Sequence, residues 1–174
     1  MQKSKFLALL SILAVFMTLV ACPPADNGKE ENNSNQVQTI EQLKPYVGKW
    51  YTAYPYPPYD DGFSISAENV LVYYNNGDPT NDIGYKGTVE SVDVSGDYLF
   101  LNLKIVDPSR SPWGLAISSY TRVLLKSISS TQCQMTTACL PTSYDQTADT
   151  IANLKTKFTI ETKAFDILGT YNKQ

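Results

Sequence analysis

A β-hairpin is the feature of this sequence that most constrains its fold. The tripeptide Ser95-Gly96-Asp97 is a turn signal between two runs of strand-forming residues. In the second run, residues 98–105, the apolar side chains stand at every second position: Leu99, Leu101, Leu103 and Ile105. Because successive side chains of a strand point to opposite faces, these four share one face. Residues 85–94 alternate in part and supply the other strand, so we expect an antiparallel sheet with one buried face.

Further strands follow at regular spacing along the chain. Each is short, rich in β-branched or aromatic residues and bounded by turn-forming residues. They are residues 70–74, 120–128, 132–138 and 158–162. In the second of these, Val123 and Leu125 lie on the opposite face from Leu124. The pattern predicts a mainly β fold, a small antiparallel β-barrel, with a β-sandwich as the alternative.

Two helical segments accompany the predicted strands. A short helical turn precedes Pro45, and a longer amphipathic segment spans residues 147–157. In the longer segment Ile151, Leu154 and Phe158 recur at helical spacing, and Thr147 is an acceptable N-cap. We expect this late α-helix to pack across the barrel wall or to close one end.

The first strand opens with Gly48-Lys49-Trp50, directly after the helical turn. This arrangement resembles the start of lipocalin barrels. The resemblance implies that Gly48 permits a tight turn into the strand and that Trp50 plugs the closed end of the barrel. It also implies that Arg122 stacks on Trp50 through a cation–π contact. The chain departs from the lipocalin pattern because it has no Thr-Asp-Tyr sequence, so Trp50 is alternatively a core aromatic residue at the start of a strand.

The N-terminal segment has the pattern of a bacterial lipoprotein signal. Lys3 and Lys5 precede an apolar run over residues 6–20, which is shorter than the roughly twenty residues that a spanning helix needs. The run ends in Leu-Val-Ala-Cys, which resembles the lipobox and implies cleavage before Cys22 and lipid on its sulfur and its new amine. Pro23 follows in place of aspartate, which by resemblance favours the outer over the inner membrane. The alternative is an ordinary secretory signal with a chance cysteine.

Residues 23–38 are polar and rich in asparagine, so they cannot bury enough surface to fold. The predicted organisation is therefore a signal peptide over residues 1–21, a flexible lipid-anchored tether over 22–38 and a single barrel domain over 39–174. This order of parts resembles the small lipoproteins of spirochaetes. The resemblance implies a place in the cell envelope rather than an activity.

Charge and composition exclude several classes of function. The formal net charge is −3, and loss of the two signal-peptide lysines makes it −5. An acidic chain argues against nucleic-acid binding, which needs a clustered basic face. The sequence contains no histidine, which excludes Ser-His-Asp and Cys-His machinery and disfavours zinc. The two carboxylates of a glycosidase lie on opposite sides of the bond that is cleaved, whereas Asp60 and Asp61 are adjacent in the chain and are unsuited to that role. We therefore expect that the protein is not an enzyme and that it has neither a cofactor nor a metal site.

Two cysteines, Cys133 and Cys139, remain once Cys22 carries lipid. An even pair in an oxidising compartment favours a disulfide. Six residues of straight strand would place them about 20 Å apart, which is beyond bridging distance. A bridge therefore requires a bend within residues 134–138, and two free cysteines are the alternative.

Two predicted loops carry aromatic residues suited to recognition. Residues 51–61 contain three prolines, which bar a central strand, and present Tyr54, Tyr56 and Tyr59; a second loop carries Trp113. Such rings with polar tips are typical of binding surfaces. The alternative for both loops is that they pack down over apolar surface.

These features lead to two hypotheses about function. In the first, the protein is a non-enzymatic binding module that holds a small apolar or aromatic ligand in the mouth of the barrel. In the second, large inward side chains fill the barrel, and the lipoprotein contacts an envelope or host protein through its Tyr and Trp loops.

Overall fold

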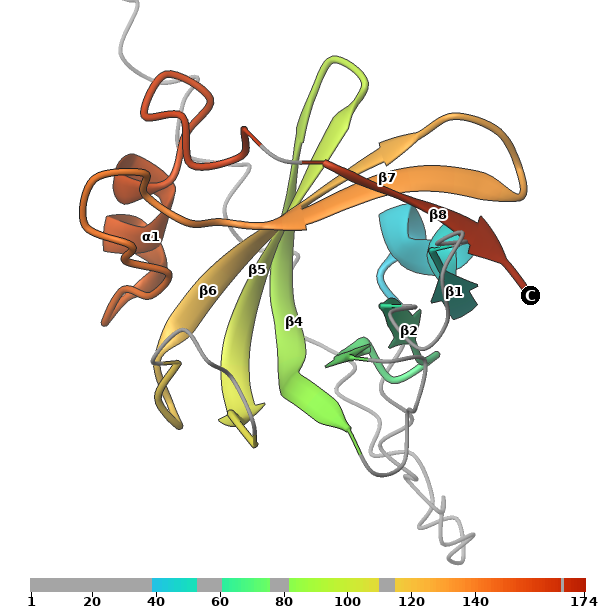
Figure 1. Cartoon of the computed structure of the whole chain (residues 1–174), viewed down its shortest axis with the longest axis horizontal. Coiled ribbons are helices and arrows are strands. Elements are labelled where there is room, and N and C mark those ends of the chain that lie inside the picture. The colour runs from blue at the N-terminus through green and yellow to red at the C-terminus, as the bar shows by residue number, and fades with distance from the viewer. Residues whose placement is uncertain (1–38, 53–60, 76–81, 110–114, 167) are drawn as a thin grey trace, which may run out of the picture. The chain divides into compact units, whose positions relative to one another are not determined.

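The computed structural model describes residues 39–52, 61–75, 82–109, 115–166 and 168–174 (Figure 1). These residues form one short 3-10 helix, one α-helix and eight strands. In chain order they are η1 (Glu41–Tyr46), β1 (Gly48–Tyr51), β2 (Gly62–Ile65), β3 (Val70–Tyr74), β4 (Ile83–Ser95), β5 (Tyr98–Asp107), β6 (Tyr120–Ser127), β7 (Gln132–Thr137), α1 (Ile151–Lys157) and β8 (Gly169–Lys173). All of them lie within one compact unit, Asn35–Gln174, so this segment contains a complete core of its own.

Each strand pairs antiparallel with the next along the chain, and β8 pairs with β1 to close a barrel. The predicted fold class is therefore confirmed, and the sandwich alternative is wrong. The hairpin at Gly96 is also confirmed: Ser95 pairs with Tyr98 across the turn, and Gly96 has a φ of 57°. Leu99, Leu101 and Leu103 contribute to the barrel interior, as their alternation predicts.

The end of the barrel at which β1 begins is filled by side chains. Leu43 and Tyr46 of η1 are buried in the interior cluster, and Trp50 is 1 % exposed. The Trp50 indole Nε1 donates a hydrogen bond to the Tyr46 carbonyl oxygen over 2.8 Å, and its ring stacks on Phe63 with centroids 5.9 Å apart. Gly48 has a φ of 127°, a conformation that L side chains rarely adopt, where the chain turns from η1 into β1.

A second apolar cluster lies outside the barrel, between its wall and the late helix. Phe100 of β5 and Leu124 of β6 meet Leu154 of α1 and Phe158 and Phe165, which follow it. The helix thus packs across the wall, as predicted, but it begins later than predicted. Thr150, not Thr147, is the N-cap, and its hydroxyl oxygen accepts a hydrogen bond from the Asn153 amide over 3.2 Å.

One predicted strand is not formed, and two strands of the barrel were not predicted. Residues 158–162 do not form a strand, because Phe158 belongs to the cluster under the helix and the chain turns there. The last strand is instead β8, and β2 was missed. Both strands carry glycine at the first position, and glycine weakens the propensity signal on which the prediction relied.

Candidate ligand-binding cavity

A cavity of about 610 Å³ lies at the barrel end opposite η1. Thr52, which follows β1, and Asn75, which follows β3, line it, as do residues of β4, β7 and β8. The segments after β7 and before β8 contribute further lining residues between 139 and 166. The barrel is therefore filled at one end and hollow at the other. A more open hollow of about 470 Å³ lies outside the barrel beside α1 and lacks an aromatic wall.

Three tyrosines and a methionine form the apolar wall of the cavity. Tyr73 and Tyr85 stack with ring centroids 5.5 Å apart and planes inclined by 17°. Tyr171 lines the cavity and packs edge-on against Phe63 at 5.0 Å, which joins the wall to the core. Met135 is 2 % exposed. A wall of this kind is suited to flat apolar molecules.

A glycine in a bulge makes room for one of these rings. The pairing of β3 with β4 shifts register after Tyr73, which leaves Gly84 unpaired in the bulge. A Cβ atom at position 84 would lie 2.8 Å from Tyr73 Cδ1. Only glycine therefore lets the Tyr73 ring keep this position without a shift.

The hydroxyl groups of Tyr73 and Tyr85 are neutral phenols at neutral pH. Burial raises the pKa of Tyr85, whose hydroxyl is hydrogen-bonded to Thr137 Oγ1 over 2.6 Å. Burial also raises the pKa of Tyr73, and the neighbouring Tyr171 and Asp61 raise it further. At neutral pH both groups can donate and accept hydrogen bonds but do not ionise.

Polar side chains complete the lining. Asp61, Lys163 and Asp166 supply charges, and Gln146 supplies an amide. Gln146 is only 7 % exposed, and its Oε1 has no hydrogen-bond partner among the described residues. The backbone of Gln146 is held in place because its carbonyl oxygen accepts a hydrogen bond from Thr121 Oγ1 over 2.7 Å.

The two cysteines are free, so the disulfide considered from the sequence is not formed. Cys133 lies inside the barrel, paired with Tyr171 and Ser127, and is fully buried. Cys139 lies beyond the other end of β7 and lines the cavity. β7 is continuous over Gln132–Thr137, so most of the segment between the two cysteines is extended, and extended chain of this length keeps them beyond bridging distance. Burial raises the pKa of Cys133 to about 12.

The predicted contact of Arg122 with Trp50 is wrong. Arg122 lies on the outer face of β6, where its guanidinium carbon is 4.4 Å from the centroid of the Phe100 ring. Its neighbours Val123 and Leu125 face the interior instead, and the period of two then puts Arg122 outside. Lys173 Nζ is the cation near Trp50, 5.4 Å from that ring's centroid.

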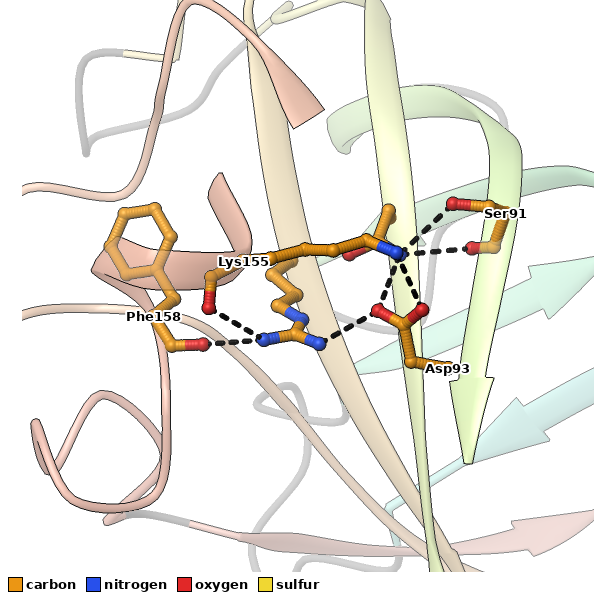
Figure 2. Close-up of polar contacts among 6 residues, drawn as sticks. Ser91, Asp93, Lys155 and Phe158 are labelled. Carbon is orange, nitrogen blue, oxygen red and sulfur yellow. Dashed lines mark hydrogen bonds and ion pairs between the residues drawn. The ribbon is translucent and has the colours of Figure 1, made fainter. Parts of the chain in front are cut away.

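On the outer face Arg122 belongs to a polar network that joins α1 to the barrel wall (Figure 2). Arg122 donates to Asp93 Oδ2 over 2.8 Å and to the Phe158 carbonyl oxygen over 2.7 Å. Lys155 of α1 donates to Asp93 Oδ1 over 2.6 Å, and Asn102 donates to Asp93 Oδ2 over 3.0 Å. Burial works against ionisation of Asp93, but these hydrogen bonds and charges outweigh it and lower the pKa of Asp93. The network fixes the helix rather than forming a site.

Several residues singled out from the sequence lie outside the described residues. They are the lipidation candidate Cys22 and the contact candidates Tyr54, Tyr56, Tyr59 and Trp113. Sequence reasoning missed the cavity tyrosines, which read as ordinary strand residues. Across the described ranges, no cluster of three or more His, Cys, Asp or Glu residues is arranged to hold a metal ion. No helix in those ranges is long and apolar enough to cross a membrane.

The comparisons with known proteins find similarity to solved structures. No protein-family model matches the sequence, and no curated protein matches it. Among solved structures, the crystal structure of Treponema pallidum pallilysin is similar with a TM-score of 0.46 and 9 % sequence identity. The match covers 76 % of this chain and 81 % of that chain.

Proposed function

We propose that this chain is a lipid-anchored envelope protein whose barrel binds a small apolar or aromatic ligand without transforming it. The observation that carries the proposal is the cavity of about 610 Å³ with its tyrosine wall. Its volume falls within the roughly 300–1,000 Å³ of small-molecule pockets. The side chains packed around Trp50 close the cavity at its inner end, which supports a preformed binding site rather than an open channel.

The chemistry of the wall supports binding rather than catalysis. A general base at neutral pH needs a pKa near the working pH. The raised pKa values of Tyr73 and Tyr85 move both groups away from that range. Their hydroxyls are suited to orient a ligand through hydrogen bonds.

The proposals of a lipid anchor and of a place in the cell envelope rest on the sequence alone. We propose that lipid on Cys22 holds the protein to a membrane, with the outer membrane favoured by Pro23. More than one acyl chain is needed for stable attachment, and the lipobox pattern implies acylation at both the sulfur and the amine of Cys22. The domain would then present its cavity at the membrane surface.

The test is native mass spectrometry of residues 35–174, purified from cells and compared with an organic extract of the same sample. We expect a co-purifying molecule of defined mass. A Cys139→Trp variant places an indole in the cavity and should lose that mass. A Ser129→Trp variant, which carries the same change in the turn between β6 and β7, should retain it.

Two results would count against the proposal. Retention of the mass in Cys139→Trp would place the molecule elsewhere on the protein. A wild-type protein free of any bound molecule, with or without organic extract added back, would shift the function to contacts with a protein partner. Tyr144, which is 68 % exposed at the rim of the cavity, would then be the first residue to test as a contact.

A further inference from the structure

The polar groups around the cavity have an excess of hydrogen-bond acceptors and of negative charge. Asp61 and Asp166 contribute two carboxylates, and Lys163 is the one cationic side chain among the described lining residues. No ion pair between these three groups is found in the described part of the chain. A ligand that supplies positive charge and N–H donors would complement this lining.

The aromatic wall favours the same kind of ligand. The face of a tyrosine ring is electrostatically negative and attracts cations. Asp61 lines the cavity together with Tyr73 and Tyr85, and its negative charge acts on the Tyr73 hydroxyl, so a carboxylate lies near the stacked pair. An ammonium group near Asp61 would therefore meet a carboxylate and a ring face together.

The side-chain oxygen of Gln146 is independent evidence that the cavity lacks a hydrogen-bond donor. This atom, Oε1, is buried and has no partner among the described residues, an arrangement that is costly for a polar atom. Because Thr121 holds the backbone of Gln146, the side chain is the part free to rotate. If the side chain rotated so that a ligand N–H donated to Gln146 Oε1, the free-energy cost of burying that oxygen without a hydrogen bond would be removed.

We propose that the cavity selects arylalkylamines: an apolar ring against the tyrosine wall and Met135, and a protonated amine toward Asp61, Asp166 and Gln146. This inference rests on the proposed function, because it names the class of ligand for the same site. An anionic ligand could use Lys163 but would face two carboxylates. A neutral aromatic ligand would leave the acceptors without a partner.

The test compares three probes that share a phenol ring and differ in the charge of the side chain. Tyramine is cationic, 4-ethylphenol is neutral and 3-(4-hydroxyphenyl)propionate is anionic. Met135 is the sole methionine native to residues 35–174, so a ¹³C-methyl label on methionine reports on the cavity through one assignable signal, which Met135→Leu identifies. We expect tyramine to saturate that signal at about tenfold lower concentration than 4-ethylphenol, with the anion weakest.

An Asp61→Asn variant removes the charge at nearly constant size. We expect it to reduce the tenfold preference for tyramine over 4-ethylphenol to near equality. Saturation of the Met135 signal by 4-ethylphenol shows that the variant is folded. The control is Asp97→Asn, which makes the same change in the β4–β5 turn, at the other end of the barrel; it should preserve the preference for tyramine.

The outcomes separate this inference from the function on which it rests. Equal binding of the three probes, or tighter binding of the neutral or anionic one, would overturn the preference for amines and leave the cavity as a binding site. No shift of the Met135 signal with any probe at millimolar concentration would overturn both. An equal loss of tyramine preference in Asp61→Asn and Asp97→Asn would show general charge attraction and overturn recognition by Asp61.

Discussion

Single polar residues decide how the outer elements of this protein are attached. Asp93 accepts hydrogen bonds from groups on β5, β6 and α1, namely Asn102, Arg122 and Lys155. The Arg122 side chain is 8 % exposed, and a buried guanidinium that loses its partner is strongly destabilising. Ionised Asp93 therefore strengthens the attachment of α1, which the apolar cluster around Leu154 and Phe158 also holds to the wall.

This role of the Asp93 carboxylate predicts a pH dependence of stability. The pKa of Asp93 is lowered in the folded protein, so the unfolded chain, with an aspartate pKa of about 3.9, binds more protons. The contribution of Asp93 to stability is complete above that unfolded value and is lost as the pH falls through the lower folded value. We expect an Asp93→Asn variant to lose less stability than the wild type between pH 6 and pH 2.5 in urea unfolding. Identical pH profiles would contradict this role.

The two thiols are predicted to differ in reactivity. Cys133 is fully buried with its pKa raised to about 12, whereas Cys139 is partly exposed in the cavity lining. Because the thiolate is the reactive form, we expect iodoacetamide to label Cys139 first in native residues 35–174, as read by peptide mass spectrometry. Cys139→Ser should remove the fast phase and Cys133→Ser should keep it. Faster labelling of Cys133 would mean that the barrel opens at its filled end.

At the scale of elements, register shifts decide which residues face which side. The pairing of β4 with β5 shifts between Val89 and Ser91, and a one-residue shift moves all later side chains to the other face of a strand. Val89 therefore points inward while Ser91 and Asp93 point outward toward Asn102. Because of this bulge, Asp93 faces outward, where its carboxylate accepts a hydrogen bond from Lys155 of α1.

The N-terminus of α1 provides a test of a local element. Thr150 caps the helix through a hydrogen bond from the Asn153 amide, so Thr150→Ala should lower the free energy of unfolding by about 1 kcal/mol. Thr147→Ala is the matched control, since Thr147 precedes the helix without capping it, and its effect should be within about 0.5 kcal/mol. Urea unfolding at constant m-value measures both. A larger effect at Thr147 would place the start of the helix where the sequence pattern suggested.

For the whole molecule, the proposed attachment to a membrane rests on Cys22, a residue far from the barrel in sequence. We expect the full chain, expressed in a bacterium with lipoprotein processing, to incorporate an alkyne-tagged palmitate and to fractionate with membranes. Cys22→Ser should abolish the label and release the protein from the membrane fraction, while Cys139→Ser should change neither. Labelling that persists in Cys22→Ser would show that lipid is attached elsewhere, and a wild-type chain without label would show that the apolar run is an ordinary secretory signal.

The amino-acid sequence by itself determined the fold class, the central hairpin and the presence of a late helix. These features follow from the period-two alternation at Leu99–Ile105, the turn at Gly96 and the helical spacing of Ile151 and Leu154. Each is a relation between residues close in the chain, so a local pattern is enough to predict it.

Only the tertiary structure decided where the faces, the thiols and the cavity lie. The bulge in β4 depends on pairing between strands, which no alternation within one strand specifies. Alternation within β6 puts Arg122 on the same face as Leu124, but both faces of this strand carry apolar residues, so only the tertiary structure decided which face is outside. Cys133 and Cys139 are kept apart because β7 is a continuous strand paired with β6 and β8. The cavity is the space that eight strands leave unfilled beside Tyr73, Tyr85 and Tyr171, and unfilled volume is a property of all the packed side chains together.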